Sequence, residues 1–308
     1  MLPLATLPVT EHQIAMLSRA GIKRVVLATA YLAEVFIPYF ADGSKWGIEI
    51  IYAVESEPLG TGGAIRNAAE YLSGNSKTVI LNGDVLSSHD LTAQLALHRE
   101  SSAEITLHLT KVEDARAYGC VPIDVSGQVT GFLEKMDNPI AETINAGTYI
   151  FDPAVIDSIP KNQVLSVERD IFPEAIRANR KIMGFVANDY WLDIGTPAAL
   201  MKGSRDLVMN IADADALDRY QFAHRSTDFV SMTNISSGNI GTIKGGSAIG
   251  GFCNLINCNI EGSIISDGVE AEDCTIINSF IEVGAKLPKG MAINNSFVDT
   301  DGEIYPFS

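Results

Sequence analysis

Apolar and polar positions follow two regular patterns along the first half of the chain. Short continuous runs of apolar and β-branched residues are typical of strands buried on both faces of a parallel sheet. Between them lie longer segments in which apolar residues recur with helical spacing. The strand-like runs occupy residues 24–28, 47–54, 79–81 and 104–109, and the helical segments 31–41, 64–72 and 91–100. This rhythm predicts an α/β fold with a Rossmann-like, mostly parallel sheet and helices on both faces.

After residue 115 the strands become shorter and turns become more frequent. The pattern predicts a hairpin at 119–133, strands at 145–151 and 182–186, and helices at 168–179 and 197–209. Pro197 lies at or near the first position of the last helix, where a missing N–H group is tolerated. These segments extend the α/β pattern as far as Phe222.

Beyond Phe222 the helical pattern disappears, and isolated Ile, Val and Leu residues lie among Gly, Asn and Ser. Two series of apolar residues are spaced six apart, with a slip of phase between them: Ile243, Ile249 and Leu255, then Ile281, Leu287 and Ile293. A six-residue period with Gly and Asn at the corners predicts a left-handed parallel β-helix, and a small β domain of another type is the alternative. We therefore expect an α/β domain at 1–222 and a hexapeptide-like β-helix domain at 223–308, the second serving structure or assembly.

Composition and charge exclude several classes of protein. Apolar residues make up 46% of the chain and charged residues 19%, as in globular proteins. The net charge of −16 argues against a broad nucleic-acid surface, which needs Lys and Arg, but permits a small phosphorylated ligand. No apolar run approaches the length of a membrane span, and the first residues lack the basic region of a secretory signal. The four cysteines form no CxxC pair, so we expect free thiols and a cytoplasmic protein.

The apolar run at 79–81 leads directly into Asn82, Gly83 and Asp84. In open α/β sheets, ligands bind at the carboxyl ends of the strands, so Asp84 would stand at the mouth of a crevice. Asn-Gly-Asp also suits an ordinary turn, which is the alternative interpretation. This segment therefore predicts a ligand site without deciding its chemistry.

Two further groups of residues suggest how such a site could hold phosphate. Asp193 follows an apolar run beside a Gly turn, and two carboxylates with substrate phosphate oxygens are a usual way to hold Mg²⁺. Glu134 and Lys135 end a predicted strand, and a lysine there can hold a phosphate as a point charge. The alternatives are two independent turn aspartates and a solvated surface ion pair.

The segment 59–64, with the sequence LGTGGA, connects a strand to a helix. Glycines allow the backbone to approach a ligand closely, and the N-terminus of the following helix offers N–H donors to an anion or a base edge. A flexible connection without a ligand is the alternative. The pattern is neither GxGxxG nor a Walker A loop, so it predicts a ligand loop of another kind.

Seven motifs occur in a fixed order along the chain. They are LGTGGA at 59–64, NGD at 82–84, Tyr118-Gly119, Glu134-Lys135, Asn145-Ala146-Gly147, ERDIFP at 168–173 and WLDIGTP at 191–197. This ordered set resembles the sugar-nucleotide pyrophosphorylases, the nucleotidyltransferases that join an NTP to a sugar 1-phosphate. The resemblance covers nearly the whole chain, including the hexapeptide-like coils. Within that family the chain is most similar to mannose-1-phosphate guanylyltransferases, through a YLAEVF helix and a PLGTGGAIRN loop.

The resemblance implies a role for each motif. The catalytic residues would be Lys135, which holds the sugar phosphate, and Asp84 and Asp193, which hold Mg²⁺. The nucleotide-binding residues would be Leu59, Gly60, Thr61, Gly62, Gly63, Asn82 and Gly83. The sugar-binding residues would be Tyr118, Gly119, Glu134, Asn145, Gly147 and Glu168. Residues 1–222 would then form the nucleotidyltransferase domain.

The implied reaction is attack by a sugar-phosphate oxygen on the α-phosphorus of the NTP, with pyrophosphate leaving. Such chemistry needs positioning and charge neutralisation more than covalent help. The expected partners are an NTP and a sugar 1-phosphate, without nucleic acid or membrane, and the likeness to guanylyltransferases favours GTP and mannose 1-phosphate among them. We also expect a homo-oligomer formed through the β-helix domain.

The chain departs from the family pattern at its start. Family members begin with a strand and a glycine-rich loop of the type GGxGTRLxPLT, followed by Lys-Pro, whereas Met1 to Ala5 resemble the residues that come directly after that Lys-Pro. We expect the missing strand to lie between the strands at 24–28 and 78–81, where its absence leaves two unpaired edges. We therefore expect little or no transferase activity from the chain as written.

Two functions remain open on the sequence. One is an enzyme, a sugar-1-phosphate nucleotidyltransferase whose start is shortened. The other is a non-catalytic homologue that binds sugar nucleotides or regulates through them. The joint presence of Asp84, Asp193 and Lys135 favours descent from an enzyme, since a pure sensor has no evident need for two metal carboxylates.

Overall fold

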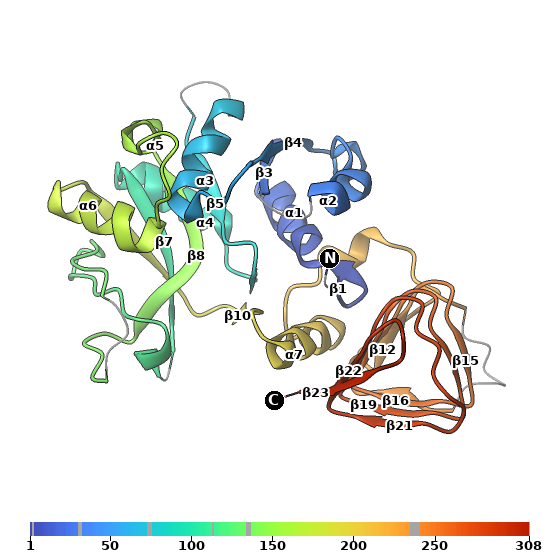
Figure 1. Ribbon diagram of the computed structural model, residues 1–308. Coiled ribbons are helices and arrows are strands. Elements are labelled where there is room, and N and C mark those ends of the chain that lie inside the picture. Colours follow the sequence, from blue (N-terminus) through green and yellow to red (C-terminus); the bar gives the residue numbers. More distant parts are fainter. Residues whose placement is uncertain are drawn as a thin grey trace. The chain divides into compact units, whose positions relative to one another are not determined.

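The computed structural model describes residues 1, 3–29, 33–72, 76–112, 114–133, 137–234 and 241–307. They form two compact units, drawn with all their elements in Figure 1. The coil unit comprises Met1–Ala15, Gly83–Ser88 and Leu192–Ser308, and the sheet unit comprises Met16–Asn82 and His89–Trp191. This partition groups two short segments with the C-terminal coils, and the domain boundary at residue 222 stays a prediction.

A four-stranded sheet in the order β5-β8-β7-β9 forms the centre of the sheet unit. Its strands are β5 (Thr78–Leu81), β7 (Ile105–Lys111), β8 (Thr143–Phe151) and β9 (Ile182–Ala187). β7 and β9 are parallel, whereas β8 runs antiparallel to both β5 and β7. The α/β fold with parallel strand pairs is thus confirmed, and β8 is the strand of opposite direction in this sheet.

Helices cover both faces of this sheet, as the alternation of side chains along β7 demonstrates. Ile105, Leu107 and Leu109 belong to an apolar cluster that includes Phe172. Thr106, which lies between Ile105 and Leu107 in sequence, points to the other face, where its hydroxyl lies 2.8 Å from His98 of the helix α4.

The helices of the sheet unit are α2 (Ala33–Phe40), α3 (Gly60–Ala68), α4 (Leu91–Glu100), α5 (Pro153–Ser158) and α6 (Phe172–Arg177), with the short turns η1 (Ser44–Trp46), η2 (Ala69–Tyr71), η3 (Ala115–Ala117) and the π-helical η4 (Val167–Ile171). The helix expected at 168–179 is therefore a π-helical turn followed by α6.

Two further strands of the sheet unit, β3 (Arg24–Thr29) and β4 (Glu49–Val54), form a separate parallel pair. The helix α3 packs against β3, and Ile65 of α3 joins the same apolar cluster as Ile80 of β5. A helix is about 10 Å across, so one helix bridges β3 and β5. Within the described residues, no strand pairs with β3 on the side away from β4, or with β5 on the side away from β8. The side chains of β3 and β5 are only half-buried or exposed, whereas nearly all those of β7 and β8 are buried.

The face of β7 that carries α4 is lined by buried histidines. His89 and His108 stack with their ring centroids 3.9 Å apart. His89 is bonded to Gln94 at 3.0 Å, whereas Nδ1 of His108 has no hydrogen-bond partner. Burial, with a smaller contribution from the neighbouring charge of His89, lowers the pKa of His108 from 6.5 to about 2.

This depressed pKa predicts a loss of stability in mild acid. Below pH 6.5 the unfolded chain binds a proton at His108 that the folded protein does not, so the free energy of unfolding falls as the pH drops. At pH 5 the linkage amounts to about 2 kcal/mol. Urea denaturation at pH 7.5 and pH 5.0 should therefore show a smaller acid loss for His108→Gln than for the original protein. His224→Gln is the control, because His224 is exposed in the coil unit, and equal acid losses for His108→Gln and the original protein would contradict the expectation.

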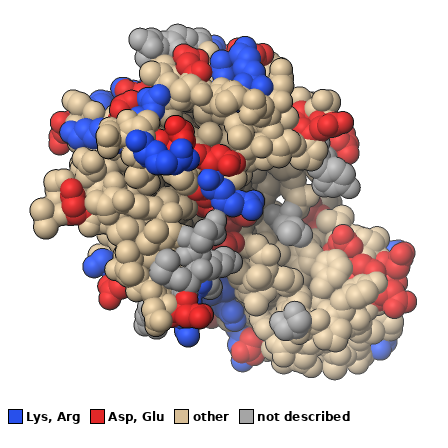
Figure 2. Space-filling model, turned by 60° about the vertical axis from the view of Figure 1, so that its left-hand side comes forward, with Lys and Arg blue, Asp and Glu red and all other residues tan. Residues whose placement is uncertain are grey.

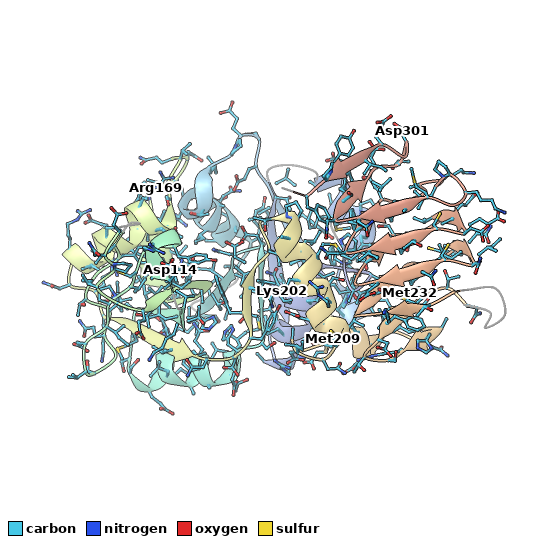
Figure 3. The ribbon with its side chains drawn as sticks, turned by 90° about the horizontal axis from the view of Figure 1, so that it is seen from below. Asp114, Arg169, Lys202, Met209, Met232 and Asp301 are labelled. Carbon is cyan, nitrogen blue, oxygen red and sulfur yellow. The ribbon has the colours of Figure 1, made fainter. Side chains whose placement is uncertain are left out.

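The C-terminal part of the coil unit is a parallel β-helix with three faces. Its strands stack in three sheets, β12-β14-β17-β20-β22, β13-β16-β19-β21 and β15-β18. Antiparallel strands β11 and β23 flank the first of these sheets, and in Figure 3 Asp301 lies near the end that carries β23. The strands of the coil unit are β1 (Pro3–Leu4), β2 (Leu7–Pro8), β6 (Val85–Ser87), β11 (His224–Arg225), β12 (Phe229–Ser231), β13 (Ile243–Lys244), β14 (Ser247–Ile249), β15 (Asn254–Ile256), β16 (Asn259–Glu261), β17 (Ile264–Ile265), β18 (Glu270–Glu272), β19 (Thr275–Ile277), β20 (Phe280–Ile281), β21 (Ala292–Asn294), β22 (Ser296–Val298) and β23 (Ile304–Pro306), and β10 (Trp191–Asp193) enters it from the sheet unit.

The register of the coils explains why the six-residue period slips. Ile243, Ile249 and Leu255 lie on three successive faces, as the period predicts. The next side is shorter, since Ile260 and Ile265 are five apart and also lie on successive faces. One turn of the coil is consequently 16 or 17 residues, as in the pairs Ile249↔Ile265 and Ile243↔Ile260. The β-helix is confirmed, and its phase slips at the five-residue sides.

The helix α7 (Pro197–Val208) packs against β14 of the β-helix and against β1. Met201 on α7 contacts a cluster with Phe280 and Ile264, and Lys202 and Met209 mark the helix and its end in Figure 3. Two other helical segments are α1 (Val9–Arg19) and the short turn η5 (Leu217–Arg219). The cysteines of the described chain are all free and buried. No helix in the described ranges combines the length and the apolar character that crossing a membrane requires.

Candidate functional site

The structure brings Asp84 and Asp193 onto neighbouring strand ends. Asp84 immediately precedes β6, Asp193 ends β10, and the two strands pair. The amide of Ile194 donates to the backbone carbonyl of Asp84 at 2.9 Å, although the two aspartates are 109 positions apart in sequence. Both side chains are exposed. Two acidic residues that are remote in sequence therefore lie on adjacent backbone segments of the β6–β10 pair.

This pair fits the ligand chemistry of Mg²⁺ when substrate completes the shell. Oδ1 of Asp193 accepts from the amide of Gly195 at 2.9 Å, which fixes the carboxylate and leaves Oδ2 for a ligand. Over the described ranges, no group of three or more His, Cys, Asp and Glu side chains could hold a metal. Mg²⁺ is commonly held by one or two carboxylates together with phosphate oxygens and water. Asp84 and Asp193 suit that role.

The glycine-rich segment is packed tightly against another part of the sheet unit. Gly60 starts α3 with a φ of +68°, and its neighbour Leu59 accepts from the amide of Leu165 at 2.9 Å. Gly62 donates to the carbonyl of Leu165 at 2.7 Å, and a Cβ on Gly63 would lie 2.4 Å from the carbonyl of Gln163. The glycines thus allow close packing within the protein, and the amide of Gly62 is already used there.

A hydrogen-bonded network joins four polar side chains of the sheet unit. Asn145 of β8 donates through Nδ2 to Glu168 at 2.5 Å and to the hydroxyl of Tyr149 at 2.8 Å. That hydroxyl donates to Oδ1 of Asn82 at 3.3 Å, at the end of β5. Gly147 donates its amide to Oδ1 of Asn145 at 3.1 Å. The structure therefore brings predicted nucleotide and sugar residues together through Tyr149.

Tyr149 was missed by sequence reasoning, although a signal was available. Tyr149 and Asn145 pair with Leu107 and Leu109 of β7 across a register shift, so the two side chains share one face of β8. Asn145 was predicted as a site residue, and because the hydroxyl of a buried tyrosine usually finds a partner, Tyr149 four positions later was a candidate for that partner.

An aromatic pair lies beside this network. Tyr118 is 48% exposed and meets Trp191 edge to face, with ring centroids 5.7 Å apart. The indole of Trp191 donates to the carbonyl of Ala146 at 3.0 Å, next to Asn145. Gly119 follows with a φ of +78°, a conformation that favours glycine. Trp191 was not predicted as a site residue, and its contacts associate it with the segment that carries the predicted residues Asn145 and Gly147.

The remaining predicted residues fall into three groups. Glu134 and Lys135 lie outside the described residues. Thr61 accepts from the amide of Val167 at 2.8 Å, which ties the glycine-rich segment to η4. Gly83 is exposed, with open space where a Cβ would stand.

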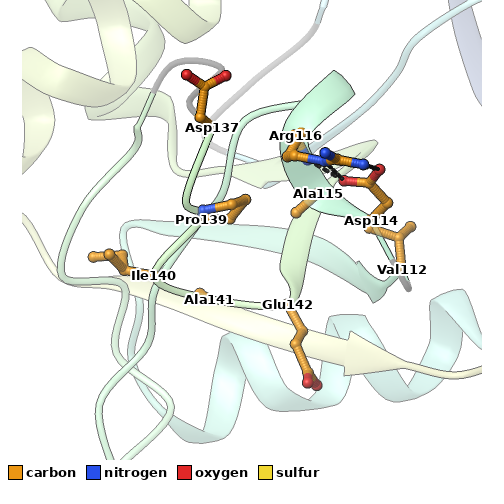
Figure 4. A pocket seen from close by; sticks show the side chains of 9 residues that line it. All are labelled: Val112, Asp114, Ala115, Arg116, Asp137, Pro139, Ile140, Ala141 and Glu142. Atoms are coloured by element: carbon orange, nitrogen blue, oxygen red, sulfur yellow. Dashed lines mark hydrogen bonds and ion pairs between the residues drawn. The ribbon is translucent and has the colours of Figure 1, made fainter.

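A pocket of about 520 Å³ in the sheet unit is lined by Val112, Asp114, Ala115, Arg116, Asp137, Pro139, Ile140, Ala141 and Glu142 (Figure 4). Arg116 donates through Nε to Asp114 at 2.8 Å, and this contact lowers the pKa of Asp114 to about 2. None of the predicted site residues that the structure describes lines the pocket. On the face shown in Figure 2, the Lys and Arg side chains of the described residues are interspersed with Asp and Glu.

Comparison with known proteins gives consistent matches. Residues 1–210 match the family model described as nucleotidyl transferase. The mannose-1-phosphate guanylyltransferase of Mycobacterium tuberculosis is 41% identical over 280 residues, which cover 90% of this chain and 76% of the relative. Mannose-1-phosphate guanylyltransferase 1 of Arabidopsis thaliana is 30% identical over 298 residues, covering 96% of this chain and 78% of the relative. The crystal structure of HddC from Yersinia pseudotuberculosis complexed with GMP-PN matches with a TM-score of 0.58 and 28% identity, over 67% of this chain and 88% of HddC.

Proposed function

The chain belongs to the nucleotidyl transferase family as a sugar-1-phosphate nucleotidyltransferase, and we propose that its substrates are GTP and mannose 1-phosphate. The products would be GDP-mannose and pyrophosphate. The observation that carries the reaction type is the convergence of Asp84 and Asp193 on paired strand ends. The names of the similar enzymes support the choice of substrates.

The residues have complementary roles in this proposal. Asp84 and Asp193 would hold Mg²⁺, which when bound would neutralise charge on the phosphates. Asn145 and Glu168 hold the hydroxyl groups of the sugar, and Asn82 lies on the nucleotide side. Lys135 would hold the sugar phosphate while one of its oxygens attacks the α-phosphorus of GTP. Positioning and charge neutralisation then carry the reaction without a covalent intermediate.

We also propose that full turnover requires a strand between β3 and β5. The two strands have open edges in the described chain, and their apolar side chains are half-buried or exposed beneath the shared helix α3. A strand placed there would pair with both edges and bury those side chains.

This part of the proposal has a direct test. The 308-residue chain is compared with a version extended at its N-terminus by a segment of the GGxGTR type. We expect turnover to rise strongly in the extended protein. Turnover of the 308-residue chain at an ordinary enzyme rate, on the order of ten per second, would refute the requirement for an added strand.

The substrates are tested by a pyrophosphate-release assay of the extended protein. GTP, ATP, UTP and dTTP are each paired with mannose 1-phosphate and glucose 1-phosphate, with Mg²⁺ or with EDTA. We expect Mg²⁺-dependent release that is fastest with GTP and mannose 1-phosphate. Binding of sugar nucleotides without any turnover would favour the alternative of a non-catalytic regulatory homologue.

The proposal also covers the compartment and the assembly of the protein. The free, buried thiols suit a reducing compartment, so we place the protein in the cytoplasm. Pairing of two chains through the β-helix is the expected mode of assembly. Size-exclusion chromatography with light scattering tests it, and a monomer at all concentrations would contradict it.

A further inference from the structure

A buried tyrosine hydroxyl lies at the centre of the polar network in the sheet unit. Tyr149 is only 1% exposed, and its ring packs against Phe172 and Phe151, with centroid distances of 5.2 and 6.2 Å. Its hydroxyl donates to Oδ1 of Asn82 and accepts from Nδ2 of Asn145. The ring contacts fix the position of the hydroxyl, and Asn82 fixes the direction of its proton.

The bonds of Asn145 decide what this carboxamide can offer to a ligand. Its two N–H groups are directed to Tyr149 and Glu168, and its Oδ1 accepts from Gly147. A carboxamide has two N–H donors and an oxygen with two lone pairs, so one lone pair on Oδ1 remains for a ligand. Glu168 uses Oε1 for Asn145 and has a second oxygen, Oε2. Both groups can accept hydrogen bonds from ligand hydroxyls, as a sugar requires.

We propose that Tyr149 is a positioning residue that sets the orientation of Asn145 and thereby its affinity for the sugar. This proposal rests on the proposed function. Without the hydroxyl, one N–H of Asn145 faces the apolar edge of a ring and loses its partner. The carboxamide then keeps only its bonds with Glu168 and Gly147, so it can shift from the position in which Oδ1 faces a ligand. Removal of the hydroxyl would therefore weaken the binding of the sugar phosphate rather than the binding of the nucleotide.

The binding of the nucleotide, for which Asn82 is proposed, should weaken less, and the reason is geometric. Asn82 keeps the bond from its own amide to the carbonyl of Gly147 at 2.8 Å, which holds the end of β5. Its side-chain bond with Tyr149 is longer, at 3.3 Å, than the 2.8 Å bond between Tyr149 and Asn145. Removal of the hydroxyl therefore breaks a shorter hydrogen bond at Asn145 than at Asn82, and the side chain of Asn145 should shift more.

The test is isothermal titration of the 308-residue chain with mannose 1-phosphate and, separately, with GTP. For Tyr149→Phe we expect the Kd of mannose 1-phosphate to rise about tenfold, the size of effect typical of one hydrogen bond in a buried network. The Kd of GTP should change by less than about twofold, well below one such bond. Tyr52→Phe is the matched control, because its hydroxyl also donates one bond, to the carbonyl of Ala41 at 2.8 Å, away from the network.

A second variant separates positioning from general stability. In an Asn145→Ala background, Tyr149→Phe should weaken the binding of mannose 1-phosphate no further, because the group that Tyr149 orients is gone. Unchanged binding by Tyr149→Phe, or equal weakening of the binding of both ligands with a lower melting temperature, would overturn the positioning role.

If the original chain bound GTP but no sugar 1-phosphate, the proposed function and this inference would both fall. Tight sugar-phosphate binding in the original chain and in Tyr149→Phe alike would remove this inference alone.

Discussion

Replacement of Asp84 by asparagine is expected to lower kcat about 10²- to 10³-fold in the N-terminally extended protein. A metal ion contributes several kcal/mol of transition-state stabilisation in such chemistry, and each 1.4 kcal/mol corresponds to a factor of about ten. Asparagine preserves the size of the side chain, and the bond from Ile194 uses the backbone carbonyl, so the strand pairing should persist. Asp193→Asn should lower kcat by a similar factor, because it removes the other carboxylate proposed to hold the metal. The asparagine oxygen can still accept from the amide of Gly195, so the local backbone should be preserved.

The two aspartates should behave as a unit. The double variant Asp84→Asn, Asp193→Asn should lose little more than either single variant, since residues that act together are not additive. In the 308-residue chain, both single variants should weaken the Mg²⁺-dependent part of GTP binding. Glu100→Gln, at the exposed end of α4, controls for the loss of one negative charge. Strictly additive losses, or a Mg²⁺ requirement unchanged in Asp84→Asn, would argue against a shared ion.

The second large effect concerns stability. Phe172→Ala should lower the free energy of unfolding of the sheet unit by about 3–5 kcal/mol, as is usual when a buried phenylalanine is truncated. Phe172 is fully buried and packs on Phe132 and Tyr149, with centroid distances of 5.1 and 5.2 Å. The cavity would open directly beneath the polar network, so binding of mannose 1-phosphate should also weaken.

The chain provides its own probe for this measurement. Its two tryptophans, Trp46 and Trp191, both belong to the sheet unit, so tryptophan fluorescence during urea denaturation reports on that unit. Val125→Ala serves as the control, because Val125 is fully exposed and should change stability by no more than about 0.5 kcal/mol. A loss for Phe172→Ala as small as the loss for Val125→Ala would show that the cluster does not support the sheet unit.

Local periodicity determined most of the elements from the sequence alone. The helix expected at 91–100 is found at Leu91–Glu100, and the strand expected at 182–186 is found at Ile182–Ala187. Strands buried on two faces and amphipathic helices leave distinct patterns, because side-chain burial follows their different periods. The six-residue spacing likewise identified the faces of the β-helix.

Some features of the fold could not be predicted, because they depend on contacts between distant segments. The direction of β8 is set by its pairing with β5 and β7, and an apolar run reads the same in either direction. The burial of Gly62 and Gly63 against Leu165 and Gln163 is also decided by packing, whereas the sequence suggested only close approach to a ligand.

For the candidate site, the sequence determined which residues carry the chemistry, since carboxylates, glycines and a lysine after predicted strands can be identified one by one. Only the tertiary structure decided which of them are neighbours. It joined Asp84 to Asp193 through paired strands, and it joined Asn82 to Asn145 through a tyrosine with no motif of its own. The physical reason is that hydrogen bonds and metal sites depend on distances of a few ångströms, which chain folding sets between residues that the sequence keeps far apart.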